Sequence, residues 1–360
     1  MGPGPSDVHP RVLAASAQPT IGHLDPEFIT LMDDIKGLLR YAFQTENTLT
    51  LPLSAPGSAA MEAAFANLVE PGDKVIVCIN GVFGMRMAEN VRRMRGELVT
   101  IEDDWGTQVD PQKLREAVAA HPDAKVVAFV HAETSTGVCS DVETLCQIAR
   151  DAGCLTIVDA VTALGGVELR VDAWGADVVY SGTQKCLSAP PGISLITFSN
   201  AAADAVQGRH TPVQSWFLDL SLLMAYWDGE GARTYHHTAP VNAMYGLHEA
   251  LLMLHEEGLE QSWSRHRQMH EQLVSGLEPL GLSFVVDAAY RLPQLNVVAA
   301  PEGVNEADVR KQLLADYNLE IGAGLGVFAG KVWRIGLMGY AARRENVQLC
   351  VSGLQNALSA

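Results

Sequence analysis

The sequence has few basic residues and no long hydrophobic run, and both shortages restrict what it can bind. Its 360 residues include 25 lysines and arginines against 42 aspartates and glutamates, which gives a formal net charge of -17. Nucleic acids and anionic membrane surfaces attract basic proteins, so we expect no nucleic-acid partner and no membrane partner. No apolar run is long enough to span a bilayer, which argues against a transmembrane protein.

Cysteine is also scarce, and the six cysteines form no Cys-x-x-Cys pair. This pattern favours reduced thiols over a disulfide framework. The chain opens with Met1-Gly2-Pro3-Gly4-Pro5, without a basic region followed by an apolar stretch, and it closes without a Ser-Lys-Leu type of address. We therefore expect a cytoplasmic location.

The chain is rich in apolar residues, because 48% of its residues are hydrophobic and only 19% are charged. This balance is typical of a protein that folds around a large core rather than a disordered one. A chain of this length is expected to form one large domain and a smaller one. We expect an N-terminal arm at residues 1–14, a large domain at 15–255 and a small C-terminal domain at 256–360.

Short apolar runs alternate with helical patterns through the first two thirds of the chain. Continuous apolar runs of this kind are typical of strands buried on both faces of a mostly parallel sheet. The expected strands are residues 74–79, 125–130, 155–158, 177–180 and 194–198. The expected helices are residues 58–68, 82–94, 111–120 and 142–152, with Asp110 and Asp141 as N-caps of the last two. The alternation predicts an α/β fold with its ligand at the carboxyl ends of the strands.

A second, smaller domain of α and β segments is expected after residue 255. A helical pattern at residues 239–277 would connect the two domains as one long helix. The small domain would contain the apolar segments 284–286, 295–298 and 332–335 and helices around 309–314 and 344–358.

Lys185 is the only charged residue between Val178 and Asn200. A lysine in apolar surroundings usually extends its ammonium group to water. This one follows a buried strand and lies in a loop with Gly182 and Pro190-Pro191-Gly192, which is expected to be rigid. Desolvation would lower its pKa and favour the neutral amine that imine formation requires.

Two further elements accompany this lysine at strand ends. Asp159 closes an apolar strand, where it could cap the next segment or meet a cation such as a protonated pyridine nitrogen. It lies about one strand–helix–strand step before Lys185, so adjacent strands would bring both to the same edge of the sheet. Gly57 and Ser58 begin a helix, where free N–H groups could bind an anion or Ser58 could serve as an ordinary cap.

Residues 155–161, Leu155-Thr-Ile-Val-Asp-Ala-Val161, and 181–192, Ser181-Gly-Thr-Gln-Lys-Cys-Leu-Ser-Ala-Pro-Pro-Gly192, resemble the lysine signature of the class V aminotransferases. These are pyridoxal-phosphate (PLP) enzymes of fold type I. The likeness is greatest to the alanine–glyoxylate (serine–pyruvate) aminotransferases and runs nearly end to end. It also includes Gly2-Pro-Gly-Pro-Ser6, Phe43-Gln-Thr-Glu-Asn47, His131-Ala-Glu-Thr-Ser-Thr-Gly137, Tyr235-His-His-Thr238 and Gly330-Lys-Val-Trp-Arg-Ile-Gly-Leu-Met-Gly339.

The resemblance implies roles around the PLP ring. Lys185 would form the Schiff base with PLP and then shuttle a proton, and Asp159 would pair with the pyridine nitrogen. Val161 would lie against one ring face. Phe83 would stack on the other face, where the animal enzymes have a tryptophan with a larger contact area. Thr134 would hydrogen-bond near the phenolic oxygen.

The resemblance also implies a phosphate site that two subunits share. Gly57, Ser58 and Gln184 would contact the phosphate, and Tyr235 and Thr238 would reach in from the neighbouring subunit of a homodimer. Pro56 and Ser58 depart from the serine and histidine of the animal enzymes, so backbone N–H groups would replace side-chain contacts there. The adjacent pair His236-His237 has no third ligand at suitable spacing, and we expect no metal.

Arg334 lies in an expected strand, where it could form a salt bridge between domains. The resemblance assigns it the substrate α-carboxylate, which a guanidinium group binds in bidentate fashion. The implied reaction is ping-pong transamination from alanine or serine to glyoxylate or pyruvate. Alternatives within the family are 3-hydroxykynurenine transaminase and ureidoglycine–glyoxylate aminotransferase, although the latter has asparagine in place of Tyr235. A nicotinamide-dependent oxidoreductase would need a Gly-x-Gly-x-x-Gly run at a strand–helix junction, and none occurs.

Overall fold

The computed structural model describes residues 1–227 and 233–359. Its central element is a seven-stranded sheet. Its strand order is β1-β9-β8-β7-β4-β2-β3. The strands are β1 (Leu49–Leu53), β2 (Lys74–Ile79), β3 (Glu97–Glu102), β4 (Val126–Val130), β7 (Leu155–Asp159), β8 (Val178–Gly182) and β9 (Ser194–Phe198). β9 runs antiparallel to its two neighbours, β1 and β8, and the other pairs in this sheet are parallel. The predicted mostly parallel α/β fold is therefore confirmed.

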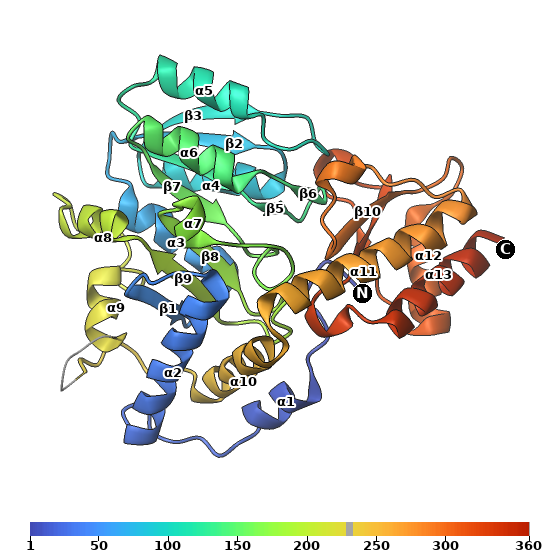
Figure 1. Cartoon of the computed structure of the whole chain (residues 1–360), viewed down its shortest axis with the longest axis horizontal. Coiled ribbons are helices and arrows are strands. Elements are labelled where there is room, and N and C mark those ends of the chain that lie inside the picture. Colours follow the sequence, from blue (N-terminus) through green and yellow to red (C-terminus); the bar gives the residue numbers. More distant parts are fainter. Residues whose placement is uncertain (228–232, 360) are drawn as a thin grey trace.

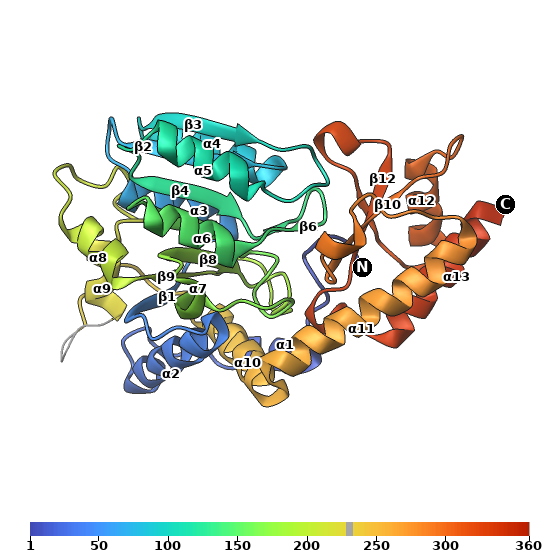
Figure 2. The ribbon, with the colours of Figure 1, turned by 45° about the horizontal axis from the view of Figure 1, so that its top comes forward.

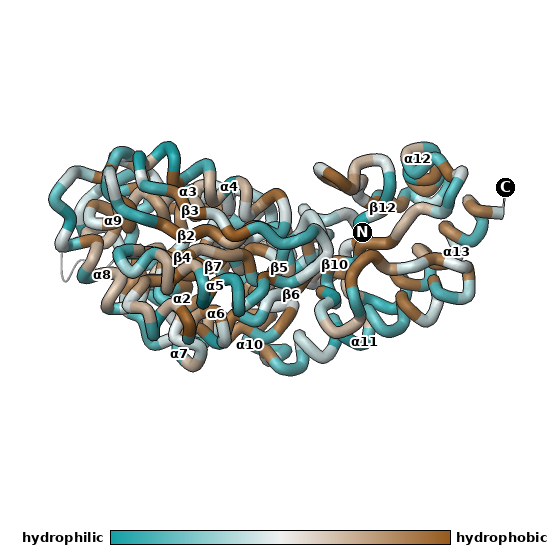
Figure 3. The backbone as a smooth tube through the Cα atoms, turned by 90° about the horizontal axis from the view of Figure 1, so that it is seen from above, coloured by the Kyte–Doolittle hydropathy of each residue, from teal (hydrophilic) through white to brown (hydrophobic). Residues whose placement is uncertain are grey.

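Helices cover both faces of this sheet (Figure 1). The helices α3 (Gly57–Leu68) and α4 (Val82–Arg93) pack on one face, and α5 (Pro111–Ala120), α6 (Val142–Asp151) and α7 (Val171–Trp174) lie on the other. Asp110 and Asp141 cap α5 and α6 as predicted, since their carboxylates accept the N–H groups of Gln112 and Thr144. The strands between these layers are buried, and Figure 3 shows hydrophobic backbone segments through the middle of this lobe.

Several elements of the large lobe lie outside the predicted set. They are the strands β1 and β3, the two-stranded ribbon of β5 (Ala132–Glu133) and β6 (Val138–Cys139), and the helices α1 (Pro10–Ser16), α2 (Pro26–Phe43), α7, α8 (Asn200–Gln207) and α9 (Leu220–Trp227). β3 is an edge strand with exposed residues at both ends, so it lacks a continuous apolar run. Residues 228–232, inside the predicted large domain, and Ala360 lie outside the described residues.

The prediction of one helix at residues 239–277 is wrong, because two helices occupy this stretch. α10 (Val241–Glu257) ends at Gly258, and α11 (Leu259–Leu277) begins directly after it. Gly258 has a φ of 86°, a conformation that glycine adopts readily and that interrupts a right-handed helix. The chain therefore turns at this residue, and α11 leads to a second, smaller lobe (Figure 2).

The smaller lobe contains a three-stranded antiparallel sheet in the order β10-β12-β11. Its elements are β10 (Leu295–Ala299), α12 (Glu306–Tyr317), β11 (Gly322–Ala323), β12 (Val332–Gly336) and α13 (Arg344–Ser359), with short 3-10 turns at Glu278–Leu280, Ala288–Tyr290, Gly326–Phe328 and Gly339–Ala341. The predicted segment 284–286 forms no strand, and Phe284 contributes a single bridge to Val298. A separate hydrophobic cluster around Leu313 and Trp333 forms the core of this lobe.

The first residues of the chain lie between the two lobes (Figure 2). The carbonyl of Met1 accepts a hydrogen bond of 2.7 Å from the backbone N–H of Gly336 in β12. Arg11 in α1 forms ion pairs with Glu249 and Glu256 of α10. None of the helices in the described part of the chain combines the length and hydropathy of a membrane span.

Candidate active site

Asp159 and Lys185 lie at the same edge of the central sheet. Asp159 is the last residue of β7, and Lys185 follows the end of β8 by three positions. The two strands are adjacent and parallel, with Asp159 in register with Tyr180. The predicted adjacency of the two strands is confirmed, and their carboxyl ends bring a carboxylate and an amine into one region.

Lys185 is buried, with 9% of its surface exposed. Burial lowers the pKa of its ammonium group to about 8, and the positive charge of Arg334 acts in the same direction. Its Nζ donates a hydrogen bond to the carbonyl of Pro3. Its pKa is therefore well below that of an exposed lysine, so the neutral amine, which is the form that attacks a carbonyl carbon, is more accessible near neutral pH.

Asp159 is a buried carboxylate with two hydrogen-bond donors. Its Oδ1 accepts the backbone N–H of Val161 at 2.9 Å, and its Oδ2 accepts the hydroxyl of Tyr180 at 2.9 Å. Burial raises its pKa to about 6, although both hydrogen bonds oppose this shift. Within the described residues no basic side chain forms an ion pair with it, so a cationic ligand group would be stabilised here.

Sequence reasoning missed Tyr180 as a partner of Asp159. The signal was present, because Tyr180 closes the next predicted strand and parallel neighbours place their last residues side by side. The hydroxyl of Tyr180 holds one oxygen of the carboxylate in place.

The start of α3 offers backbone N–H groups without a side-chain cap. Pro56 is the residue before the helix and makes no capping hydrogen bond, Gly57 is buried and Ser58 is exposed. A Cβ atom placed on Gly57 would lie 3.4 Å from the Val161 side chain, so this turn is close to the residues that follow Asp159. In the loop after β8, directly before Lys185, the Oε1 atom of Gln184 is buried without a hydrogen-bond partner.

Phe83 and Thr134 come from two further strand ends. Phe83 lies in the first turn of α4, is half-buried, and has the guanidinium group of Arg86 4.8 Å above its ring. Thr134 is buried, and its hydroxyl lies 2.5 Å from that of Thr162. The charge of Arg86 also reaches Asp159, whose pKa it lowers.

Arg334 extends from β12 of the smaller lobe to the large lobe. Its Nη1 donates to the carbonyl of Thr134 at 3.2 Å, and its Nε donates to the carbonyl of Ala323 at 2.7 Å. The side chain is buried, and burial lowers its pKa. Within residues 1–227 and 233–359 no carboxylate forms an ion pair with it. A buried guanidinium group of this kind is suited to bind a carboxylate ligand.

Tyr235 and Thr238 are not brought to Lys185 within this chain. Both are exposed, Tyr235 by 59%, and their hydroxyls lie 3.3 Å apart. The neighbouring His237 bonds through Nε2 to the hydroxyl of Ser54 at 2.6 Å, and its Nδ1 lies 2.8 Å from that of His236. The described residues contain no cluster of three His, Cys, Asp or Glu side chains that could hold a metal ion.

The N-terminal residues form a part of the site that sequence reasoning did not assign. The backbone N–H of Ser6 donates to the carbonyl of Gln184 at 2.8 Å, and its hydroxyl donates to the carbonyl of Lys185 at 2.7 Å. A Cβ atom on Gly4 would lie 2.6 Å from the Nζ atom of Lys185. A larger residue at position 4 would therefore collide with the lysine.

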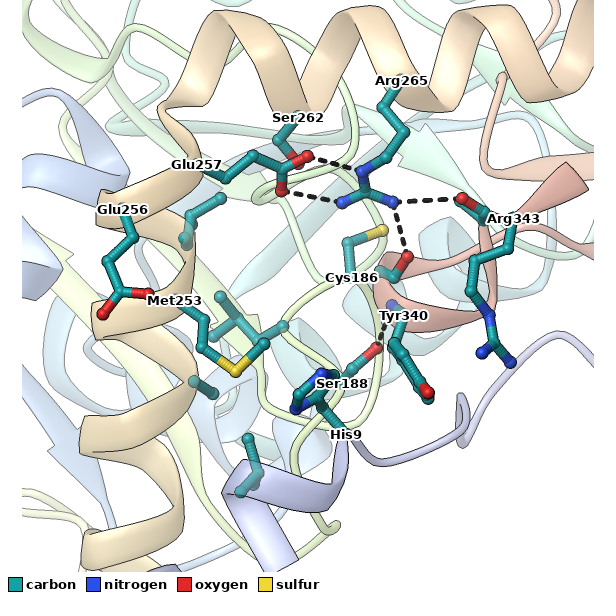
Figure 4. Close-up of a pocket in the computed structure, with 16 residues that line it drawn as sticks. His9, Cys186, Ser188, Met253, Glu256, Glu257, Ser262, Arg265, Tyr340 and Arg343 are labelled. Carbon is teal, nitrogen blue, oxygen red and sulfur yellow. Dashed lines mark hydrogen bonds and ion pairs between the residues drawn. The ribbon is translucent and has the colours of Figure 1, made fainter.

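Figure 4 shows a separate cavity of about 430 Å³ at the junction of α10, α11 and the loop that follows Lys185. Cys186, Met253 and Tyr340 are among its lining residues. Arg265 lines it as well, but its guanidinium group already contacts Glu257 and the carbonyl of Gly339. None of the predicted site residues lines this cavity, which is distinct from the candidate active site.

The residues at the sheet edge fit PLP. The ligand has an aldehyde, a ring nitrogen that gains a proton, and a phosphate, and the structure provides one matching group for each. They are the amine of Lys185, the carboxylate of Asp159 and the uncapped N-terminus of α3 beside the unpaired Gln184 oxygen.

Comparison with known proteins agrees with this match. The family model described as "Aminotransferase class-V" covers residues 11–349. An alanine–glyoxylate aminotransferase of Oryctolagus cuniculus is 42% identical over 99% of this chain and 92% of its own. The crystal structure of an alanine–glyoxylate aminotransferase from Nostoc sp. has 47% identity and a TM-score of 0.97, over 99% of this chain and 94% of its own. A ureidoglycine–glyoxylate aminotransferase structure from Bacillus subtilis has 38% identity and a TM-score of 0.97, over 100% of this chain and 92% of its own. The chain belongs to the class V aminotransferases and is a PLP-dependent enzyme.

Proposed function

We propose that this enzyme transfers an amino group from L-alanine or L-serine to glyoxylate or pyruvate, by a ping-pong mechanism. With glyoxylate as acceptor, the products are glycine and the 2-oxo acid of the donor. The observation that carries the proposal is the joint placement of Lys185, Asp159 and Arg334. Lys185 and Asp159 lie at the ends of adjacent parallel strands, and Arg334 reaches from the smaller lobe to the carbonyl of Thr134, which supports one shared site. The names of the relatives from Oryctolagus cuniculus and Nostoc sp. support alanine as donor and glyoxylate as acceptor.

The proposed roles follow from the chemistry of the groups in the site. Bound PLP supplies an electron sink that stabilises negative charge at the substrate Cα. Lys185 would hold the cofactor through Nζ in the resting enzyme and, once displaced, would take the proton from Cα. Asp159 would keep the ring nitrogen protonated. Arg334 would hold the substrate α-carboxylate and so orient the Cα–H bond toward the amine of Lys185.

The remaining proposed roles concern binding of PLP. Val161 and Phe83 would lie on the two ring faces, and Thr134 would donate to the phenolic oxygen. The phosphate would be bound by Gly57, Ser58 and Gln184, and by Tyr235 and Thr238 of the partner subunit. The uncapped α3 terminus and the exposure of the Tyr235 and Thr238 hydroxyls support this arrangement.

A homodimer, a cytoplasmic location and the domain limits are part of the same proposal. Exposed Tyr235 and Thr238 support a dimer, because their hydroxyls do not contact the site of their own chain. The six free cysteines support a reducing compartment. The proposed limits are residues 1–14, 15–255 and 256–360, and the second hydrophobic cluster, which includes Met269 and later residues, supports a separate C-terminal core.

Two other substrates remain as alternatives within the family. The similarity to the ureidoglycine–glyoxylate aminotransferase from Bacillus subtilis favours ureidoglycine as a second candidate, at lower identity than the Nostoc protein. A 3-hydroxykynurenine transaminase is the other candidate. A nicotinamide-dependent oxidoreductase is set aside, because the family assignment covers residues 11–349.

A half-reaction panel tests the substrate assignment. The PLP-loaded enzyme is mixed separately with L-alanine, L-serine, 3-hydroxykynurenine and ureidoglycine, and the change in cofactor absorbance is followed. We expect the fastest conversion with alanine or serine, followed by recovery of the starting spectrum on addition of glyoxylate. A fast reaction with 3-hydroxykynurenine or ureidoglycine alone would overturn the proposed donors.

A further inference from the structure

Glu133 is a fully buried carboxylate that binds the start of α4. Its Oε2 accepts the backbone N–H groups of Phe83 at 3.1 Å and Gly84 at 3.4 Å. Its Oε1 accepts the N–H and the hydroxyl of Ser135 at 3.0 and 2.6 Å. Oε2 therefore binds the start of α4, and Oε1 binds the turn that follows β5. The residue that makes both contacts is 0% exposed.

This contact replaces an ordinary helix cap. The residue before α4 is Gly81, which has no side chain to cap the helix, and a Cβ atom there would overlap the Glu133 carboxylate and the hydroxyl of Ser135. The hydroxyl of Ser135 accepts the N–H of Val82 at 2.9 Å. The first N–H groups of α4 thus donate hydrogen bonds to residues of the β5–β6 ribbon, about 50 positions later in the chain.

A second glycine brings the same turn close to the sheet. A Cβ atom on Gly84 would lie 2.9 Å from the carbonyl of Cys78 and 3.0 Å from the Cα of Ile79, at the end of β2. Phe83 lies between this contact and the one at Gly81. The backbone of Phe83 is therefore held between Glu133 and β2, and its half-buried ring has the guanidinium group of Arg86 over one face.

The burial of Glu133 is costly in the absence of a cation. Within the described residues no basic side chain forms an ion pair with it, and burial raises its pKa to about 7. The N-terminus of α4 partly offsets this cost through its free N–H groups and its dipole. A side-chain cap at position 81 has no room, because its Cβ atom would overlap Glu133 and Ser135, so the start of α4 depends on acceptors from the β5–β6 ribbon.

We propose that Glu133 is a positioning residue for the cofactor, acting through Phe83. By holding the backbone of Phe83, it sets the ring face against which the PLP ring would stack. This inference rests on the proposed role of Phe83 and adds a residue that does not itself touch the cofactor. The next residue, Thr134, contacts Arg334 through its carbonyl, so one short segment aligns both the cofactor side and the substrate side of the site.

The test measures the affinity of the apo-enzyme for PLP by fluorescence titration, together with the melting temperature of each variant. Glu133→Ala leaves the N–H groups of Phe83, Gly84 and Ser135 without their carboxylate acceptor and should weaken PLP binding about 10-fold. Glu133→Gln keeps an oxygen that accepts from Phe83 and Gly84, and should stay within roughly three-fold of the wild-type affinity. Asp141→Ala, which removes an exposed cap from α6, is the matched control and should lower the melting temperature without weakening PLP binding.

A double-mutant cycle with Phe83→Leu separates positioning from general destabilisation. If Glu133 acts through Phe83, Glu133→Ala should have little further effect on PLP affinity in the Phe83→Leu background. Additive losses, or an unchanged affinity in Glu133→Ala, would overturn the inference. Should Glu133→Ala fail to fold, Ser135→Ala takes its place in the same cycle with the same criteria. Failure of the wild-type apo-enzyme to bind PLP would instead overturn the proposed function itself.

Discussion

At the scale of single residues, burial changes the chemistry of Lys185 more than any neighbouring charge does. A lysine in water has a pKa of about 10.5, and burial lowers that of Lys185 to about 8. The amine is mostly protonated below this pH and mostly neutral above it. Only the neutral form attacks the aldehyde of PLP.

The rate at which the apo-enzyme captures PLP should therefore depend on pH in a defined way. We expect the second-order rate constant to rise with pH and to level off above about 8, because the pKa of Lys185 lies there. Stopped-flow absorbance measures this rate. A rate that keeps rising to pH 10 would show that Lys185 behaves as an ordinary exposed lysine.

Arg334 carries a separate prediction about the substrate. Replacing it with glutamine removes charged hydrogen bonds to the α-carboxylate and should raise the KM for L-alanine roughly 10- to 100-fold. Arg334→Lys keeps the charge but loses the bidentate fork, so we expect an intermediate KM. PLP affinity should be unchanged in both variants. A KM near that of the wild type in Arg334→Gln would remove this residue from the substrate site.

The sequence predicted the chemical types in the site better than their contacts. Lys185 and Asp159 were found because each interrupts or closes an apolar run, and a charge in such a position is costly unless it is used. Tyr180 carries no charge, and only its place at the end of the predicted strand beside Asp159 could have indicated its role, while Glu133 lies in a short polar segment. Their roles depend on distances between segments, which only the folded chain defines.

At the scale of elements, buried strands were predicted well and irregular ones were not. β9 has five buried residues in one apolar run and was predicted with its observed limits. β1 is equally buried, but its Thr50 and Pro52 obscure the run, and β3 is a half-exposed edge strand. The long helix prediction failed at Gly258, where the hydrophobic period continues although the backbone turns.

The break between α10 and α11 can be tested by substitution. Gly258→Ala places a Cβ atom in a conformation, φ 86° and ψ 141°, that non-glycine residues rarely adopt. We expect a loss of about 1–3 kcal/mol in stability and a lower melting temperature. Gly37→Ala is the control, because Gly37 lies inside α2 and no atom lies within 4 Å of the place that an added Cβ would take. That change should stabilise the enzyme by about 0.5–1 kcal/mol. Equal effects of the two changes would contradict a special role for Gly258.

At the scale of the whole molecule, the proposed phosphate site is incomplete in a single chain and would be completed by the partner subunit of a dimer. Tyr235 and Thr238 are exposed in the single chain, and their hydroxyls contact each other rather than Lys185. A partner subunit that inserts these side chains into the phosphate site would explain their exposure. Sequence analysis of one chain supplies this idea only through family resemblance, because the symmetry of an assembly leaves no periodic pattern in the sequence.

Subunit mixing tests the shared site directly. Lys185→Ala and Tyr235→Ala should each have little activity alone, because each dimer lacks one essential group in both sites. Co-refolded as a mixture, half of the dimers would be hybrids with one intact site, so about a quarter of wild-type activity should return. A mixture without recovered activity would show that each chain completes its own site. Analytical ultracentrifugation of the hybrid provides the control for dimer formation.

The most direct test of the central claim is to locate the bond between enzyme and cofactor. The PLP-loaded enzyme is reduced with borohydride and digested, and the modified peptide is identified by mass spectrometry. We predict that the pyridoxyl group is found on Lys185, in the loop that follows β8. A pyridoxyl group on any other lysine, with Lys185 unmodified, would contradict the account.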